Sequence, residues 1–244
     1  MDNINTLLAY NSSLKIIQKD DTFNFSTDST ILSFFAKDSV RSGKIIDLGS
    51  GTGAIPLFMS MFRKDKIYGV EIQENIALMS KESIKLNNLE SQIEILIDDI
   101  KGISKKFNPS EFNLVLSNPP YFRVEDTKIK NENEALLIAR HEVKITMEDI
   151  IKEAKTLLKD NGSLCMVQRS DRFLETIFLL NKYGFTLKRL RFVYPKPNKE
   201  SHIFLFDARK TNKTHGLKVL EPLYIYNKND DFSDEMKEMY HYGE

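Results

Sequence analysis

The sequence predicts an α/β fold, with a mostly parallel sheet, helices on both faces and an antiparallel pair of strands at one edge. Short β-branched or apolar runs alternate with longer segments whose apolar residues recur at helical spacing. After residue 184, two runs typical of strands follow each other with no helix between them, which indicates antiparallel pairing. The chain has 244 residues with no internal repeat and no low-complexity linker, so we expect a single domain over residues 1–244.

The first 43 residues are expected to form a hairpin and a helix ahead of the sheet. Residues 14–25 are typical of a short hairpin that turns at Asp20 and Asp21. Thr27, Asp28 and Ser29 are typical of a helix N-cap, and this helix is expected to end near Ala36. A core over residues 44–213 and a C-terminal extension over residues 214–244 would complete the domain.

The core is expected to hold a seven-stranded sheet, made of five parallel strands and the antiparallel pair. The parallel strands are predicted at residues 44–48, 66–71, 93–97, 112–117 and 163–168, and the antiparallel pair at 185–194 and 201–209. Apolar stripes predict helices from Ile76 to Leu86 and from Ile150 to Leu158, and another helix is expected at residues 171–183. Asn161-Gly162 is expected to cap the second of these helices.

The composition excludes several classes of protein. The 35 basic residues balance the 35 acidic ones, which excludes a globally basic coat protein, and 41% hydrophobic residues exclude a disordered chain. Cys165 is the only cysteine, so no internal disulfide can form and we expect it in the core. No secretion signal, no membrane-spanning run and no His/Cys cluster with metal-ligand spacing occurs. We therefore expect a cytoplasmic protein with no membrane association and no metal.

A glycine-rich turn lies between the first parallel strand and its helix. Gly49, Gly51 and Gly53 let the backbone approach a ligand, and the helix start offers unpaired N–H groups. Glu71 ends the next strand 20 residues after Gly51, where a carboxylate can accept hydrogen bonds from both hydroxyls of a ribose. The same spacing satisfies a dinucleotide fingerprint, and a turn without a ligand is the structural alternative.

Acidic residues at the strand ends favour a cationic ligand. A carboxylate at Asp47 would repel a pyrophosphate, whereas it attracts the ammonium and sulfonium groups of S-adenosylmethionine. Asp47 can also pin the loop through backbone N–H groups, which is compatible with that ligand. Asp98 and Asp99 end the third strand, where one of the two carboxylates could accept a hydrogen bond from the adenine amino group of the cofactor and the other would face solvent. Loop capping is the alternative for both.

Asn118-Pro119-Pro120-Tyr121 follows the fourth strand and carries the chemistry. Two prolines remove backbone donors and leave carbonyls without a ladder partner. An exocyclic amine or an amide nitrogen is a poor nucleophile because its lone pair is delocalised. If the Asn118 side-chain oxygen and the Pro119 carbonyl each accept one amine hydrogen, the nitrogen approaches a tetrahedral geometry without a strong base. Tyr121 supplies a flat surface for a planar substrate.

These residues, taken in order, resemble the Rossmann-like S-adenosylmethionine-dependent amino-methyltransferases. The resemblance covers residues 44–122 and rests on Asp47 to Gly53, Glu71, Asp99 and Asn118 to Tyr121. It implies the class I methyltransferase fold, S-adenosylmethionine as cofactor and catalysis at the Asn-Pro-Pro-Tyr motif. The motif does not choose the substrate, because enzymes acting on DNA adenine, on RNA adenine or guanine, and on the glutamine amide of release factors share it.

Three further segments resemble the bacterial group that methylates N6 of adenine 37 in the anticodon loop of a valine tRNA. They are residues 25–29 (Phe-Ser-Thr-Asp-Ser), residues 139–142 (Ala-Arg-His-Glu), and residues 216–218 (Gly-Leu-Lys) together with 223–226 (Leu-Tyr-Ile-Tyr). This similarity implies a tRNA substrate and places Asp28 among the cofactor contacts. The glutamine-amide enzymes usually carry a helical domain before the fold, and only 43 residues precede Lys44 here. Methylation of ribosomal RNA, DNA or a protein amide, and a non-catalytic RNA-binding protein, are the alternatives.

A basic strip supports an RNA partner. Residues 182–213 contain nine basic and two acidic residues, a net charge of +7 in a chain whose total is zero. Phosphates of a folded RNA would suit such a strip on an edge hairpin. We expect phosphate contacts from Arg189, Arg191, Lys196 and Lys199, in an enzyme that acts as a monomer. A solvated edge strand protected by lysines is the alternative.

Overall fold

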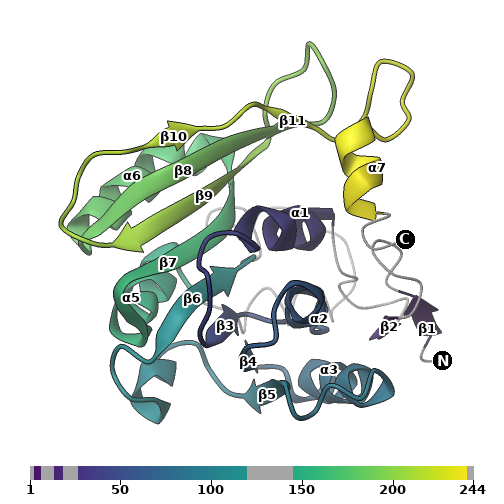
Figure 1. Ribbon diagram of the computed structural model, residues 1–244, viewed down its shortest axis with the longest axis vertical. Coiled ribbons are helices and arrows are strands. Elements are labelled where there is room, and N and C mark those ends of the chain that lie inside the picture. The colour runs from purple at the N-terminus through teal and green to yellow at the C-terminus, as the bar shows by residue number, and fades with distance from the viewer. Residues whose placement is uncertain (1–2, 7–13, 19–26, 120–144, 241–244) are drawn as a thin grey trace, which may run out of the picture.

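A mostly parallel sheet forms the centre of the protein in the computed structural model, which describes residues 3–6, 14–18, 27–119 and 145–240 (Figure 1). Its strand order is β10-β8-β9-β7-β6-β3-β4-β5, and β11 also pairs with β8. The strands are β3 (Ile45–Leu48), β4 (Ile67–Glu71), β5 (Ile93–Ile97), β6 (Phe112–Ser117), β7 (Leu158–Arg169), β8 (Phe185–Tyr194), β9 (Ile203–Lys210), β10 (Lys218–Val219) and β11 (Leu223–Tyr224). The predicted α/β class and all seven predicted strands are confirmed.

The helices cover both faces of this sheet. They are α1 (Thr27–Ala36), α2 (Ala54–Phe62), α3 (Glu74–Leu86), α5 (Met147–Leu157), α6 (Phe173–Lys182) and α7 (Asp234–Tyr240), with short 3-10 helices η1 (Ile103–Lys106) and η3 (Ser170–Arg172). None of these described helices combines the length and the apolar character that a bilayer crossing requires.

Alternation along the strands builds two cores. Ile45 and Leu114 belong to the core beneath α1, α2, α3 and α7. Their chain neighbours Ile46 and Val115 belong to the core beneath α5 and α6. Successive side chains of a strand point to opposite faces, so a strand that is buried on both faces must be apolar throughout. Cys165 is fully buried in the first core, as expected.

The N-terminal hairpin is formed by residues other than those expected. β2 (Lys15–Gln18) pairs antiparallel with β1 (Asn3–Thr6), with Ile4 opposite Ile17. The expected turn at Asp20-Asp21 and the strand after it lie outside the described residues. Strand β1 carries too short an alternating pattern to identify from the sequence.

The predicted C-cap at Asn161-Gly162 is wrong. Helix α5 ends at Leu157, and β7 begins at Leu158, which pairs with Phe112 of β6. Asn161 adopts φ of 61° inside the strand rather than after a helix. An Asn-Gly pair is suited to a left-handed residue both at a helix end and in an irregular strand, so the sequence signal was ambiguous.

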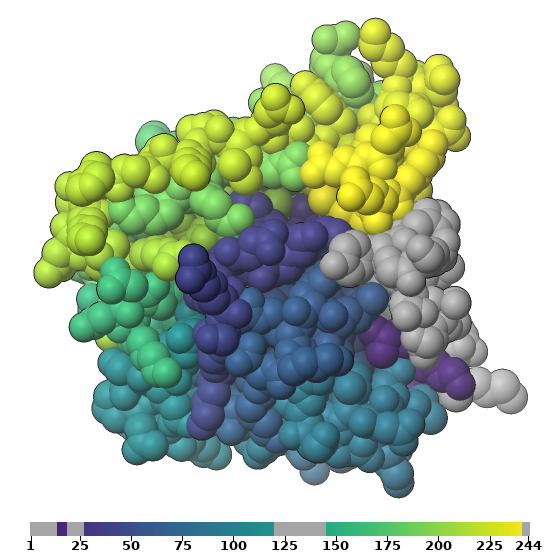
Figure 2. All heavy atoms as spheres, viewed as in Figure 1, coloured from purple at the N-terminus to yellow at the C-terminus, as the bar shows by residue number. Residues whose placement is uncertain are grey.

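The antiparallel pair does not form the edge of the sheet. β9 pairs with β7 on one side and with β8 on the other, both antiparallel. The outer side of β8 is covered by β10 and β11, which run parallel to it. The C-terminal extension thus completes the sheet, and Figure 2 shows its yellow atoms lying against the α1 region.

A buried polar cluster joins α1 to the sheet. Arg189 of β8 donates to the carboxylate of Asp207 on β9 at 3.0 Å and to the carbonyl of Phe35 in α1 at 2.9 Å. Its guanidinium also bonds Ser39 Oγ and lies 4.5 Å from the centre of the Phe35 ring. Asp207 is 1% exposed, so Arg189 is the counter-charge that makes its burial tolerable.

We expect Arg189→Ala to lower the free energy of unfolding by about 3–5 kcal/mol, because it leaves the Asp207 carboxylate buried without its counter-charge. Arg169→Ala is the matched control, since Arg169 pairs with Asp171 on the exposed surface, and it should cost less than about 1 kcal/mol. Urea unfolding of both variants measures the difference. Equal losses in the two variants would contradict the role assigned to Arg189.

Candidate functional site

The predicted site residues gather at one edge of the sheet. Strands β3, β4, β5 and β6 are mutually parallel, so all four end on the same side. The glycine loop follows β3, Glu71 ends β4, Asp98 and Asp99 follow β5, and Asn118 follows β6. The carboxyl edge of a parallel sheet is where α/β proteins bind their ligands.

All three glycines of the loop have a left-handed backbone. Gly49, Gly51 and Gly53 have φ of 82°, 54° and 86°. A Cβ on Gly53 would come within 2.2 Å of Ser80 Oγ, whereas a Cβ on Gly51 would meet nothing within 4 Å. Gly53 is therefore required for packing of α2 against α3, and the backbone at Gly51 borders open space that a ligand can approach.

Glu71 ties the loop to the next strand. Its carboxylate accepts hydrogen bonds from the backbone N–H groups of Gly51 and Gln73, both at 2.9 Å. The side chain is 7% exposed. A carboxylate oxygen has more than one acceptor position, so these bonds fix the group without using up its capacity to accept from hydroxyls. The neighbouring Ile72, which the sequence analysis missed, is 41% exposed at the same strand end.

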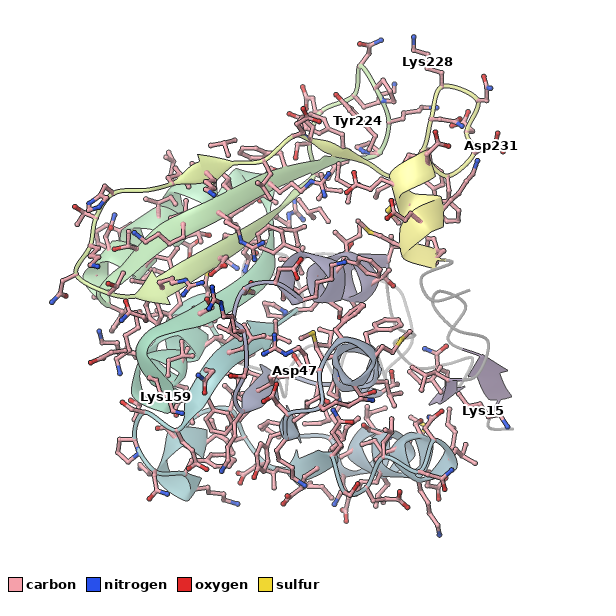
Figure 3. The ribbon with its side chains drawn as sticks, in the orientation of Figure 1. Lys15, Asp47, Lys159, Tyr224, Lys228 and Asp231 are labelled. Carbon is pink, nitrogen blue, oxygen red and sulfur yellow. The ribbon has the colours of Figure 1, made fainter. Side chains whose placement is uncertain are left out.

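Asp47 is the least satisfied charged group of the site. It is fully buried in the centre of the molecule (Figure 3). Neither carboxylate oxygen has a hydrogen-bond partner among the described residues. Burial, and then the nearby charge of Glu71, raise the pKa of Asp47 well above its ordinary value. The expected pinning of the loop by Asp47 is thus not seen, and a cationic ligand would fit this carboxylate.

Asp98 and Asp99 both take part in local contacts. Asp98 accepts from the backbone N–H of Asp99 at 2.8 Å and pairs with Lys106. Asp99 is exposed and accepts from the backbone N–H of Lys101 at 2.8 Å. Because the pair with Lys106 occupies Asp98, the structure favours Asp99 for a ligand contact, which stays a prediction.

Asn118 is held against the first turn of α1. Its side-chain Nδ2 donates to Ser29 Oγ at 3.1 Å. Ser117 Oγ, just before it, donates to the carbonyl of Leu48 at 2.7 Å, which joins the end of β6 to the end of β3. Asp28 lies in the same turn of α1 as Ser29. The site thus includes Ser29, which the sequence analysis assigned to a helix N-cap rather than to the site.

The remaining motif residues are described only in part. Pro119 is buried, and Pro120 and Tyr121 lie outside the described residues, as does the segment 139–142. Within the described ranges no group of three His, Cys, Asp or Glu side chains is arranged to hold a metal ion.

Three of the four predicted RNA contacts have partners within the chain. Arg189 is used by the buried cluster described above. Arg191 donates to both carboxylate oxygens of Glu235 in α7, at 2.6 and 2.7 Å, and to the carbonyl of Glu221 at 2.9 Å. Lys196 pairs with Asp230 at 2.7 Å. Lys199 is exposed. The structure therefore favours structural roles for both arginines, and phosphate contacts by the four residues stay a prediction.

Comparison with known proteins agrees with this geometry. A protein named tRNA1(Val) (adenine(37)-N6)-methyltransferase from Bacteroides fragilis is 28% identical over 64% of this chain and 65% of its own length. A protein of the same name from Porphyromonas gingivalis is 27% identical over 75% of this chain and 73% of its own length. This chain therefore spans about two thirds to three quarters of the curated relatives compared here, and 65% of the first.

Solved structures share the fold. The crystal structure of a predicted O-methyltransferase from Agrobacterium tumefaciens superposes with a TM-score of 0.66 at 20% identity, over 88% of this chain and 98% of the other. The model of the family described as methyltransferase small domain matches residues 25–187, a span that runs from the turn holding Ser29 through the glycine loop and Asn118 to the start of β8. The chain belongs to this methyltransferase family.

Proposed function

We propose that this protein transfers a methyl group from S-adenosylmethionine to the N6 amine of an adenine in tRNA, namely adenine 37 in the anticodon loop of a valine tRNA. The observation that carries the proposal is the placement of Asn118 beside the glycine loop and the unpartnered Asp47, at one edge of the sheet. This edge therefore carries both a carboxylate that can bind a cation, Asp47, and a side-chain amide that can bind an amine, Asn118.

The residues at the edge fit the cofactor. Asp47 offers a buried negative charge to a cationic ligand, and Gly51 lets the backbone approach it. Glu71 would accept hydrogen bonds from the ribose and Asp99 from the adenine, and Asp28 lies on the adjoining turn of α1. When bound, S-adenosylmethionine supplies an electrophilic methyl group on a positively charged sulfur.

Asn118 prepares the amine. Ser29 Oγ accepts from Nδ2 of Asn118, and this contact uses the donor end of the amide. The acceptor end and the carbonyl of Pro119 can each take one hydrogen from the adenine N6 amine, which draws the nitrogen toward a tetrahedral geometry. Tyr121 would stack on the base, and Pro120 would keep the turn rigid. No general base is required at neutral pH.

The choice of tRNA rests on the relatives. Both bacterial relatives carry the name of a tRNA adenine-37 N6-methyltransferase. The proposal takes the enzyme to act as a monomer. A tRNA-modifying enzyme works where tRNA is, which supports a cytoplasmic location.

We expect turnover with tRNA and not with the other classes of acceptor. Purified protein, incubated with labelled S-adenosylmethionine, should methylate bulk tRNA from cells lacking the gene, and mass spectrometry of the digested nucleosides should show N6-methyladenosine. Ribosomal RNA, DNA and release factors are the parallel substrates. Methylation confined to one of those would reassign the substrate, and RNA binding without any turnover would reduce the protein to a binding module.

Asn118→Ala should lower turnover by about a hundredfold while cofactor binding stays nearly intact, since the lost acceptor acts most strongly in the transition state. Asn118→Asp should keep more activity because an acceptor oxygen remains. Ser29→Ala should fall between the wild type and Asn118→Ala. N6-methyladenosine formed in tRNA is the readout. Wild-type turnover in Asn118→Ala would remove this residue from the catalytic centre.

Asp47→Asn should stabilise the cofactor-free protein at neutral pH and weaken cofactor binding. Burial raises the pKa of Asp47 in the folded protein above its ordinary value of 3.8. Between pH 3.8 and that raised pKa, Asp47 keeps its proton in the folded protein but loses it in the unfolded chain. The free energy of unfolding of the wild type therefore falls as the pH rises through this range. Asp47→Asn has no titrating group at this position, so its free energy of unfolding should not show this fall. Urea unfolding at about pH 4 and about pH 8 measures it, and calorimetry measures cofactor affinity. An unchanged affinity would contradict the assignment of Asp47.

A further inference from the structure

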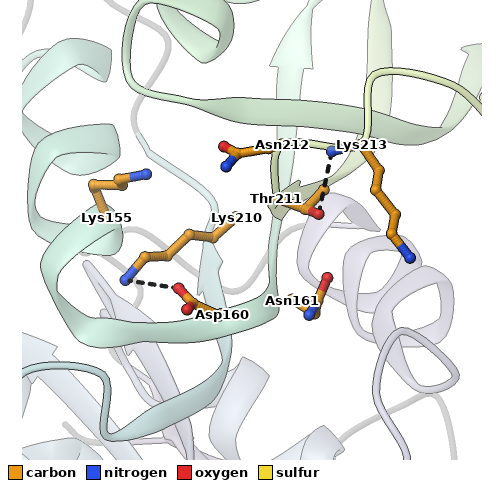
Figure 4. A pocket seen from close by; sticks show the side chains of 7 residues that line it. All are labelled: Lys155, Asp160, Asn161, Lys210, Thr211, Asn212 and Lys213. Carbon is orange, nitrogen blue, oxygen red and sulfur yellow. Dashed lines mark hydrogen bonds and ion pairs between the residues drawn. The ribbon is translucent and has the colours of Figure 1, made fainter.

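A pocket lies at the opposite edge of the sheet from the proposed reaction site. It has a volume of about 310 Å³ and lies among Lys155, Asp160, Asn161, Lys210, Thr211, Asn212 and Lys213 (Figure 4). Lys155 comes from α5, Asp160 from the start of β7 and Lys210 from the end of β9. Since β7 runs parallel to β6, the start of β7 marks the amino edge of the parallel strands.

The lining carries an excess of positive charge. Three of its side chains are lysines and one is a carboxylate. That carboxylate, Asp160, is 89% exposed and lies 3.8 Å from Lys210 Nζ. Lys155 and Lys213 have no ion-pair partner within the described ranges. Burial lowers the pKa of Lys210; Asp160 raises it, and Lys155 lowers it further. The nearby charges of the two lysines therefore repel each other.

Hydrogen bonds fix the shape of this lysine pocket. Lys210 Nζ donates to the carbonyl of Leu158 at 2.7 Å, which holds β9 against the start of β7. Lys188 Nζ donates to the carbonyls of Lys213 and His215, at 2.7 and 2.5 Å, and so holds the loop after β9. Arg209 donates to the carbonyl of Asn161 at 3.2 Å. The cationic side chains of Lys188 and Arg209 therefore also lie close to the pocket.

This chemistry selects a phosphate. Ammonium groups bind phosphate oxygens as point charges, and the side-chain amides of Asn161 and Asn212 provide further donors. A carboxylate or sulfate would meet the same donors, but a polyanionic RNA is the ligand that the proposed function supplies. None of the residues that line the pocket is aromatic or aliphatic, so it suits the backbone rather than the stacking of a nucleobase.

We propose that the lysine pocket binds backbone phosphates of the tRNA substrate, remote from the nucleotide that reacts. Phe112 pairs with Leu158 at the pocket edge, and Asn118 lies six positions after Phe112, just beyond the end of β6, a span of about 20 Å in a strand. A separation of that size exceeds the reach of a single nucleotide and lies within that of a folded tRNA. This inference rests on the proposed function. It assigns phosphate contacts to the lysines of the pocket, which line open space, rather than to Arg189 and Arg191, which have partners within the chain.

The double variant Lys155→Ala/Lys213→Ala tests the proposal in the full chain. It removes two charges but keeps Lys210, which is needed for packing. We expect the KM for full-length tRNA to rise by about tenfold and the salt dependence of tRNA binding to flatten by about one to two units of slope. The KM for a trinucleotide that contains the target adenine should stay unchanged because that fragment is too short to reach the pocket. Lys81→Ala/Lys85→Ala, on the exposed face of α3, is the charge-matched control and should behave like the wild type.

The outcomes separate the two proposals. If the wild type methylates tRNA and the pocket variant matches it in KM and salt slope, the lysine pocket has no role in binding RNA. An equal loss with the trinucleotide and with whole tRNA would also overturn the proposal, because the effect would then not depend on distance. If the wild type forms no N6-methyladenosine but its tRNA binding depends on the two lysines, the proposed function fails and the pocket stands. If millimolar inorganic phosphate displaced bound tRNA from the wild type as fully as unlabelled tRNA does, the pocket would be a site for free phosphate instead.

Discussion

Parallel pairing of β3 with both β4 and β6 is the constraint on which the site depends. Each strand must return to the same edge through a crossover, so every loop that follows a strand is brought to one side of the molecule. Residues separated by up to 71 positions, Asp47 and Asn118, are neighbours at that edge for this reason alone. The hydrogen bond of Ser117 to the carbonyl of Leu48 and that of Glu71 to Gly51 then fix the spacing between adjacent strand ends.

The site contains a conflict between stability and ligand binding. A buried carboxylate without a partner, such as Asp47, is unfavourable in the ligand-free fold. Elsewhere the protein resolves the same problem within the chain, since Asp207 has Arg189 as its counter-charge. The difference between these two aspartates separates a structural charge, Asp207, from Asp47, which we propose to bind a cationic ligand.

The sequence predicted the fold well where periodicity was long and failed where tertiary pairing decided the outcome. The bounds of β8, residues 185–194, match the expectation because a long run rich in aromatic and aliphatic residues lies between Gly184 and Pro195. Asn161-Gly162 misled because pairing of Leu158 with Phe112 ended the helix earlier than local propensity required. Arg189 and Arg191 lie on the same face of β8 as the buried Val193. On that face they contact α1 and α7 rather than solvent, which a count of charges along the sequence could not show. Ser29 was missed since a hydroxyl on a helix start is typical of a cap.

The order of synthesis gives a further meaning to the way β10 and β11 cover β8. Both strands belong to the final part of the described chain, so the ribosome has already released β8 and β9 when the residues that pair with β8 emerge. Until then β8 presents a row of unpaired backbone groups, the kind of edge on which partly made chains associate. The nascent protein is thus most exposed to self-association between the emergence of β8 and its pairing with β10 and β11, and a chaperone that holds chains at that stage would protect it most.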